Sequence, residues 1–339
     1  MATVYKTTLI PAVAVLRPVD MGAEDLFFSK RRFFGTQEVE FDSVTIDGTT
    51  SGYNSFANSA KVVKKDGFDT IRLNPLNINE AINITAENSK NRGFNEPKYG
   101  GSMSGGEQAI QNELEGFSKL KARADRTKKR AMYEALTTGK IVYGQDGIAE
   151  IDFNMPVANK EVLTGTDLWS DTDSDPVAKL VEIYDGMIDA PTDAILSQSA
   201  YQAFIGHSRV RFGADANGKI ANVNKNAVAS AKGSKFIFVG TLADRPLDLW
   251  LEIDTYVDSA GARQKYLTDG FVVIGSSTQA EMLYGGIPTV IGDNVEWQVA
   301  EFLPAVATET NPAKVDRIYK TAPLPTLKNG GSFYSLKAL

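Results

Sequence analysis

Few residues in this chain of 339 amino acids could support nucleophilic or metal-assisted chemistry. The absence of cysteine excludes a thiol nucleophile, a disulfide framework and a thiolate metal site. The only histidine is His207, so a multi-histidine metal cluster is also excluded. The chain has no Gly-x-Ser-x-Gly elbow, and 101–105 has Met103 where the nucleophile would stand. We interpret His207 as a helix-end or solvated residue and predict no catalytic residue.

The glycine-rich run 100–106 precedes a predicted helix, and helix N-termini attract anions. The run lacks the Gly-Lys-Ser/Thr of a P-loop and the Gly-x-Gly-x-x-Gly of a dinucleotide fold. We therefore interpret it as a hinge beside a long helix, and we predict no cofactor.

Three carboxylates at alternate positions, Asp171, Asp173 and Asp175, resemble the start of a calcium-binding loop. Glu182 stands at the twelfth position, but Pro176 occupies the sixth, where that loop requires glycine. Acidic residues before a helix also cap it and complement its dipole. We favour the capping interpretation and predict no metal site.

Seven basic side chains lie between Lys119 and Arg130 against one acid, Asp125. The following segment, 144–193, has the opposite balance, with twelve acidic residues. We favour a solvated or inter-chain face for the basic run, with the acidic segment as its counterpart between subunits. The alternative is contact with nucleic-acid phosphates, without sequence readout because no aromatic residues are interleaved.

The composition is that of a folded protein of mixed α and β structure. Forty-two per cent of residues are apolar, and the net charge of −6 argues against a dedicated nucleic-acid-binding protein. The length allows about two domains, or one elongated domain with extensions. The apolar stretch 9–16 is too short to span a membrane, and we prefer a cytoplasmic product to a secreted one.

The clearest predicted element is a helix over 105–138, where apolar residues recur at helical spacing. Ser104 and Glu107 have the spacing of a capping box, and Gly139 suits a left-handed cap at the other end. Such a helix is about 50 Å long.

Shorter elements follow this helix. A second helix is predicted from Asp175-Pro176, with an apolar face that includes Ile188, and a third around 199–205. Strands are predicted at 148–153, 235–239, 247–257 and 271–274. We predict that the last two form a hairpin through a turn at 258–261, and that Pro323 and Pro325 break the tail into short strands.

The first hundred residues contain little helical signal. The cluster 26–34 places four phenylalanines beside three cations, as either a core anchor or a docking segment for a neighbouring chain. The stretch 46–104 is rich in Gly and Asn, with strand signals only at 61–64 and 68–73. A segment this long with so little regular pattern indicates a projecting hairpin or arm.

Eight short motifs keep a common order along nearly the whole chain: Leu26–Phe28, Phe34–Val39, Glu150–Asp152, Leu168–Ser170, Lys265–Asp269, Val273–Gly275, Thr278–Ala280 and Thr321–Leu324. In this order they resemble the capsid E family, the lambda-like major capsid proteins of tailed bacteriophages. That family has the Hong Kong ninety-seven capsid fold, so the resemblance implies an α+β protein with this architecture.

The resemblance also implies a division of the chain. Residues 1–45 would be an N-terminal arm and 46–104 an extended E-loop. Residues 105–175 would hold the spine helix and the first part of the peripheral domain. Residues 176–305 would form the axial domain, and 306–339 the C-terminal strands of the peripheral domain.

The implied function is a structural head protein that self-assembles into an icosahedral shell enclosing viral double-stranded DNA. Its partners would be further copies in hexamers and pentamers, a separate scaffolding protein, a portal, in some cases a decoration protein, and DNA through non-specific contact. The family has no active site, so no catalytic, metal or cofactor residue is carried over. The locations would be the virion and, during assembly, the host cytoplasm. The alternatives are an encapsulin-like compartment and, more remotely, a hydrolase or nucleotide-binding enzyme.

Overall fold

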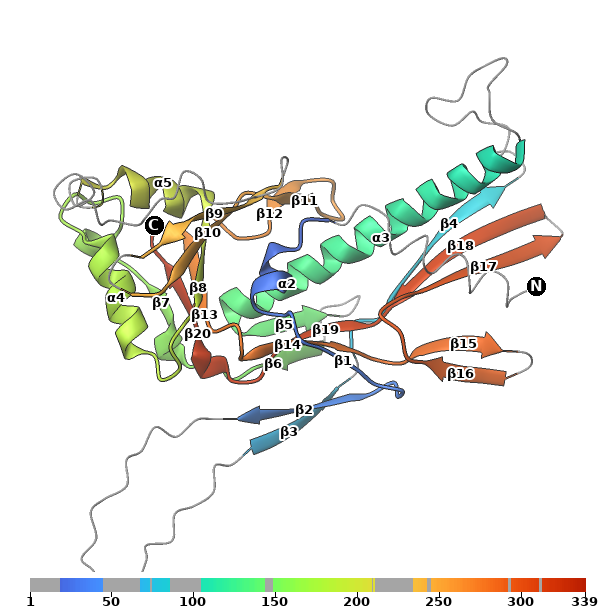
Figure 1. The fold of residues 1–339 in the computed structure, drawn as a ribbon, viewed down its shortest axis with the longest axis horizontal. Helices are drawn as coiled ribbons and strands as arrows, with labels where there is room; N and C mark the ends of the chain where they lie inside the picture. The colour runs from blue at the N-terminus through green and yellow to red at the C-terminus, as the bar shows by residue number, and fades with distance from the viewer. Residues whose placement is uncertain are drawn as a thin grey trace, which may run out of the picture.

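A computed structural model describes residues 19–44, 68–73, 75–85, 105–143, 149–208, 210, 234–242, 245–291, 294–310 and 313–339. A long helix, α3 (Gly105–Thr138), crosses the molecule, with sheets arranged along it (Figure 1). Of the predicted glycine-rich hinge at 100–106, residues 100–104 lie outside the described residues, and Gly105 and Gly106 are the first residues of α3. The Ser104 cap and the strand at 61–64 also lie outside the described residues.

Helix α3 confirms the longest predicted element, and its two halves contribute to different hydrophobic cores. Phe117, Leu120 and Ala124 belong to a small core with Ile78 and Tyr319. Further along, residues 131–136 join the central core of the molecule. The helix therefore links two separately packed regions.

The end of α3 confirms the predicted glycine cap. Gly139 has φ +72°, and its N–H donates to the carbonyl of Ala135 (2.9 Å). A Cβ at this position would lie 2.5 Å from Cβ of Met155. Both the backbone conformation and the close approach therefore require glycine.

The largest sheet has six strands in the order β7-β20-β13-β8-β10-β9, and α4 and α5 pack against it (Figure 1). Its elements are β7 (Lys160–Val162), α4 (Pro176–Gly186), β8 (Asp193–Ser197), α5 (Gln198–Gly206), β9 (Phe236–Thr241), β10 (Asp248–Glu252), β13 (Phe271–Gly275) and β20 (Phe333–Lys337). Strand β8 is buried along its whole length, as expected for a strand near the centre of a covered sheet.

Both short helices begin at the predicted places, with side-chain caps. The Asp175 carboxylate accepts a hydrogen bond from the N–H of Ala178 (3.0 Å), with Pro176 as the first helical residue. Ser197 caps α5 in the same manner. The prediction for Ile188 was wrong, because α4 ends at Gly186 and Ile188 is 66% exposed.

A three-stranded sheet, β1-β14-β19, lies in the central core next to α2 (Gly22–Leu26). Its strands are β1 (Arg31–Phe33), β14 (Ala280–Tyr284) and β19 (Pro323–Leu327). The predicted division of the tail into short strands is confirmed at Pro323, where β19 begins, but β19 continues through Pro325, so the predicted break at Pro325 was wrong. Because β19 is an edge strand, neither proline has to donate a hydrogen bond on its outer side.

A second three-stranded sheet, β17-β18-β4, packs along the first half of α3 (Figure 1). It contains β4 (Ile78–Thr85), β17 (Leu303–Thr310) and β18 (Ala313–Thr321). The register of β4 and β18 runs from Lys314 opposite Thr85 to Thr321 opposite Ile78. The sheet thus joins a strand from the first hundred residues to the tail.

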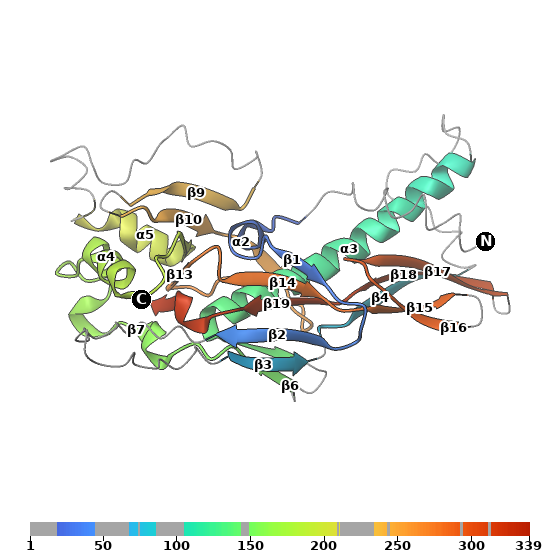
Figure 2. The ribbon, with the colours of Figure 1, turned by 60° about the horizontal axis from the view of Figure 1, so that its bottom comes forward.

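Four strand pairs and three single-turn helices complete the described part. The pairs are β2 (Val39–Val44) with β3 (Phe68–Leu73), β5 (Lys140–Tyr143) with β6 (Ala149–Asp152), β11 (Thr255–Val257) with β12 (Arg263–Lys265), and β15 (Ile287–Ile291) with β16 (Asn294–Gln298). The turns are η2 (Val157–Asn159), η3 (Gly165–Asp167) and η4 (Gly330–Ser332). Figure 2 shows β2 and β3 beside β6, where Phe41 contacts Phe153.

The predicted hairpin between 247–257 and 271–274 was wrong. The first of these segments divides into β10 and β11 at Ile253 and Asp254, and the turn at 258–261 returns the chain through β12 instead. Strand β13 pairs with β8 and β20. The predicted turn at 258–261 is confirmed, since Gly261 has φ +83°. The strand to which this turn leads was predicted wrongly.

The phenylalanine cluster acts as a core anchor, as one of its two interpretations predicted. Phe27 and Phe28 are fully buried, and Phe27 meets Phe333 edge to face at 5.7 Å between ring centroids. Phe33 stays 44% exposed, stacked on Tyr284. Residues 19–44 therefore pack on their own chain.

Candidate assembly surfaces

The β15–β16 hairpin forms a two-stranded sheet of its own. In both ribbon views it extends from the main body on the side of β17 and β18 (Figures 1 and 2). Its contact with that sheet includes a hydrogen bond from Nζ of Lys320 to the carbonyl of Pro288 (3.2 Å).

The register of this hairpin places apolar side chains together on one face, whereas the opposite face is mixed and carries Ile287 and Ile291 together with Thr289, Asn294, Glu296 and Gln298. Val290 lies opposite Val295, and Pro288 lies opposite Trp297. Paired residues share one face of a sheet, and so do residues two apart along a strand. One face therefore carries Pro288, Val290, Val295 and Trp297, and Val299 continues the alternation just beyond β16. We call these five residues the apolar hairpin face.

Most of this apolar face is exposed. Val290 and Val295 are each 68% exposed, Val299 59% and Trp297 42%. A two-stranded sheet is only marginally stable in water without a covered hydrophobic face. Contiguous exposed apolar side chains mark interaction surfaces, so this hairpin is a candidate contact for another protein surface.

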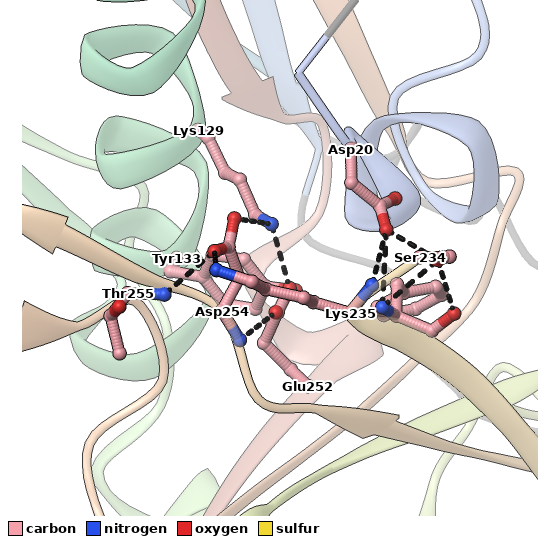
Figure 3. A network of polar contacts seen from close by, with 9 residues as sticks. Asp20, Lys129, Tyr133, Ser234, Lys235, Glu252, Asp254 and Thr255 are labelled. Carbon is pink, nitrogen blue, oxygen red and sulfur yellow. Dashed lines mark hydrogen bonds and ion pairs between the residues drawn. The ribbon is translucent and has the colours of Figure 1, made fainter. Parts of the chain in front are cut away.

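A buried ionic cluster joins α3 to the six-stranded sheet (Figure 3). The Lys129 side chain is fully buried, and its Nζ lies 3.1 Å from Oε2 of Glu252 and 3.1 Å from Oδ2 of Asp254. The same ammonium lies 4.6 Å from the ring centroid of Tyr266. The Tyr133 hydroxyl donates to Oε2 of Glu252 (2.6 Å). We call this cluster the α3 junction.

The α3 junction extends to β9 and to the residues before α2 (Figure 3). Lys235 binds the second oxygen of Asp254 (2.9 Å), and its backbone N–H donates to Asp20 (2.9 Å). The Asp20 carboxylate also accepts hydrogen bonds from the N–H of Phe236 (3.1 Å) and the hydroxyl of Ser234. Four parts of the chain that are distant in sequence are thereby held together.

Burial and neighbouring charges shift the pKa values of the acids in the junction in opposite directions. Burial raises the pKa of Glu252, although the Lys129 ammonium and the Tyr133 hydroxyl oppose it. Burial also acts to raise the pKa of Asp254, but the hydrogen bond from Lys235 and the Lys129 charge outweigh it and lower that pKa. Burial and the neighbouring Glu252 raise the pKa of Tyr133 well above its usual value, so the phenol stays protonated.

The neighbouring lysine makes a second buried contact. Nζ of Lys128 lies 2.9 Å from Glu24 of α2, which also binds Arg31 (3.1 Å). Arg31 reaches Glu301 (2.9 Å), and the Tyr284 hydroxyl donates to the same carboxylate (3.2 Å). These ion pairs tie α2 and β1 to the middle of α3.

The basic run 119–130 therefore divides into two parts. The prediction of a solvated or inter-chain face was wrong for Lys128 and Lys129, which are buried in ion pairs within the chain. Lys119, Arg123, Arg126 and Arg130 are exposed. The burial could not be read from the run itself, because the acidic partners come from distant segments.

The predicted helix-end position of His207 is confirmed, although the side chain is buried and not solvated. It is the C-cap of α5, and its Nε2 lies 3.2 Å from Oγ of Ser174 and 3.0 Å from the carbonyl oxygen of Asp171. These contacts fasten the loop before α4 to the end of α5.

The carboxylates of the calcium-like motif bind backbone and side chains of their own segment. Asp171 accepts from the N–H of Asp173 (2.9 Å), Asp175 caps α4, and Glu182 pairs with Lys179 (3.2 Å). Among the residues that the structure describes, no group of three or more His, Cys, Asp or Glu side chains is arranged to hold a metal ion. None of the described helices has the length and apolar character needed to cross a membrane.

The hairpin was missed at the sequence level, although a signal existed. Apolar residues alternate on both sides of Gly292-Asp293, from Pro288 to Val290 and again from Val295 to Trp297. Two alternating runs around such a glycine-containing pair are typical of a β-hairpin.

One known protein family matches nearly the whole chain. The sequence model for "Phage major capsid protein E" matches residues 6–338. A search of curated protein sequences finds no match.

Several solved structures are similar in fold. A protein described as a prophage capsid protein from Escherichia coli CFT073 has a TM-score of 0.71 at 15% identity, covering 98% of this chain and 99% of that chain. A phage-related protein from Bordetella bronchiseptica RB50 has a TM-score of 0.57 at 10% identity, covering 98% and 96%. An encapsulin from Synechococcus elongatus PCC 7942 has a TM-score of 0.48 at 11% identity, covering 91% and 85%. At these identities the likeness shows a shared fold.

Proposed function

The chain belongs to the phage major capsid protein E family, and on that premise we propose that its copies close into an icosahedral shell around double-stranded DNA. It is a structural protein of the virion with the tailed-phage capsid fold. In the proposed shell, the copies form hexamers and pentamers and have no catalytic role.

The exposure of the apolar hairpin face is the observation that best supports self-assembly. Burying one Val or Leu side chain stabilises by about 1.5–3 kcal/mol relative to exposure. Three exposed valines and a tryptophan on one hairpin therefore offer several such increments, from which the cost of association is subtracted. The same hairpin is present on every copy, so each copy has an apolar surface for a neighbour to cover.

The proposed division of the chain assigns the elements of the fold to domains. Helix α3 is the spine, the β17-β18-β4 sheet belongs to the peripheral domain, and α4, α5 and most of the six-stranded sheet belong to the axial domain. Two strands of that sheet, β7 and β20, come from outside the proposed 176–305 range. Residues 19–44 of the proposed N-terminal arm (1–45) pack on their own chain, and most of the proposed E-loop (46–104) lies outside the described residues.

We also propose a separate scaffolding protein, a portal and, in some shells, a decoration protein as partners. Contact with packaged DNA is non-specific, and assembly takes place in the host cytoplasm. These partners rest on membership of the family.

The test is assembly of the purified full chain, followed by light scattering and electron microscopy. We expect closed shells or curved capsid-like sheets from the unaltered protein. Val290→Ser combined with Val295→Ser should leave small oligomers with an unchanged circular dichroism spectrum. Thr289→Ser combined with Glu296→Gln changes the opposite face of the same hairpin and should assemble normally.

Two results would contradict these proposals separately. Small oligomers of the unaltered protein under all assembly conditions, with or without co-expressed scaffold, would contradict the shell. Normal shells from the double serine variant would contradict the role of the hairpin. A shell that co-purifies with an enzyme would indicate an encapsulin-like compartment instead.

A further inference from the structure

Four exposed cations form a line along one side of α3. Lys119, Arg123, Arg126 and Arg130 follow one another at intervals of four, three and four residues. Residues three and four apart lie on the same helix face, so these side chains form one stripe about 16 Å long. We call it the basic stripe; Lys128 and Lys129 do not belong to it, because they are buried.

The basic stripe lies along an open groove. One cavity of about 610 Å³ lies between α3 and β4 and is lined by Lys119, Arg123, Arg126 and Glu80. A second cavity, of about 590 Å³, shares Arg123, Arg126 and Glu80 and continues past Arg130 to the turn after β11. Because the two cavities share lining residues, the groove follows the helix for the length of the stripe.

The charge inside this groove is positive. Glu80 is paired with Arg123 (2.7 Å), and Asp258 at the far end accepts the N–H groups of Ala260 and Ala262 within its own turn. Against these two acids stand the four cations of the stripe. The groove therefore favours an extended anionic ligand.

An acidic segment of a second copy is a poorer occupant than DNA. The acids of 149–193 that could supply it are largely paired within their own chain. Asp185 binds Arg245 through two hydrogen bonds of 2.7 and 2.6 Å, and Glu161 binds Lys179 (2.9 Å). Double-stranded DNA presents one negative charge per about 1.7 Å of its axis, at regular spacing, and its mobile counterions are released when a cationic surface binds.

We propose that the basic stripe on α3 contacts the phosphate backbone of the packaged double-stranded DNA. This inference rests on the proposed function, and it identifies a surface for the non-specific contact. Arginine guanidinium groups suit phosphate because they can donate two parallel hydrogen bonds. The contact has no sequence preference, since phosphates carry no base information.

The test measures binding of the full chain to a fluorescent 30-base-pair duplex, below the protein concentration at which shells form. Three to four phosphate contacts give a slope of log affinity against log salt of about −2.7 to −3.6. Affinity should then fall about 40- to 150-fold between 50 and 200 mM salt. Lys119→Gln, Arg126→Gln and Arg130→Gln together should bring the slope to about −1 or less in magnitude.

The matched control removes three positive charges elsewhere, as Lys140→Gln, Lys160→Gln and Lys265→Gln. This control should bind the duplex with nearly the slope of the unaltered protein. A stripe variant that binds DNA like the unaltered protein would overturn the inference. So would a stripe variant that fails to assemble while its DNA slope is unchanged, because the stripe would then be a contact between copies. If the unaltered protein fails to assemble, that result contradicts only the proposed shell. It does not affect the DNA-binding test, because duplex binding is measured on unassembled chains.

Discussion

Replacing Lys129 with methionine tests whether the α3 junction holds the two regions of the fold together. Methionine keeps most of the aliphatic stem of the lysine and removes its charge. Nζ of Lys129 lies 3.1 Å from each of two carboxylates, so the variant leaves Glu252 and Asp254 facing each other without their shared cation. The two acids are 3% and 9% exposed, which leaves little water to replace the lysine.

The expected loss follows from this burial. Removing one partner of a buried ion pair costs about 3–5 kcal/mol, because the remaining charge is buried without compensation. Here that charge is the Glu252 carboxylate, since Asp254 keeps its ion pair with Lys235. Unfolding entropy is about 2.1 cal/mol/K per residue, which over 339 residues is about 0.7 kcal/mol/K. The melting temperature should therefore fall by about 4–7 °C.

The assay is thermal unfolding of the unassembled chain by calorimetry. Arg130→Met is the matched control, because Arg130 is the next residue of the same helix and is exposed. It should change stability by less than about 0.5 kcal/mol. Adding Glu252→Gln to Lys129→Met removes the uncompensated charge and should recover about 1–2 kcal/mol of the loss. If Lys129→Met and Arg130→Met have the same melting temperature, the ion pairs of Lys129 do not stabilise the fold.

Two further substitutions test other contacts. Gly139→Ala should lower the free energy of unfolding by clearly more than Gly165→Ala, measured by urea titration. Both positions have positive φ, which costs about 1–2 kcal/mol for alanine, but a Cβ at Gly139 also meets Met155 at 2.5 Å, whereas nothing lies within 4 Å at Gly165. Equal losses would contradict the close approach. Asp254→Asn should reduce the loss of unfolding free energy that the protein shows as the pH falls into the acidic range. The folded pKa of Asp254 is lowered from 3.8, so its contribution is present above about pH 4 and is lost as pH falls through the folded pKa. An unchanged loss of unfolding free energy in urea titrations from pH 5 to pH 2 would contradict this.

The elements governed by local sequence could be predicted. Helix α3 has the predicted bounds, because its apolar spacing and the glycine after it act within a few residues. The start of α4 was also predictable, since Asp175 caps the helix and Pro176 suits its first turn.

What could not be predicted depends on contacts between distant residues. In the sequence, Lys128 and Lys129 stand in a run of basic residues, which predicts a solvated face. Their buried partners are far along the chain: Glu24 is 104 residues from Lys128, and Asp254 is 125 residues from Lys129. The pairing of β13 with β8 and β20 was equally out of reach, because turn chemistry at 258–261 identifies a turn and not the partner of a later strand. Pro325 lies within a strand because β19 is at a sheet edge, and edge position is a property of the whole sheet.

The candidate assembly surface was predictable only in part. Alternation around Gly292-Asp293 indicates a hairpin, but it does not say which face is covered. On an ordinary surface hairpin, the apolar face packs on its own protein. Here Ile287, on the opposite face, is buried, whereas Val290 and Val295 are exposed, and this choice between the two faces is visible only in the three-dimensional structure.

Buried charge and exposed apolar surface serve different purposes in this molecule. Separating Lys129 from its acids would leave charges unpaired in the poorly solvated interior, so the α3 junction is expected to stay unchanged during assembly. The apolar hairpin face can be covered and uncovered without breaking a hydrogen bond. In the proposed shell, each such contact supplies only a few kcal/mol after the cost of association. Modest contacts repeated over many copies hold a closed shell, because every copy is tied to several neighbours at once. A misplaced copy, tied by fewer contacts, can still dissociate, so a rigid subunit with weak apolar contacts favours correct closure.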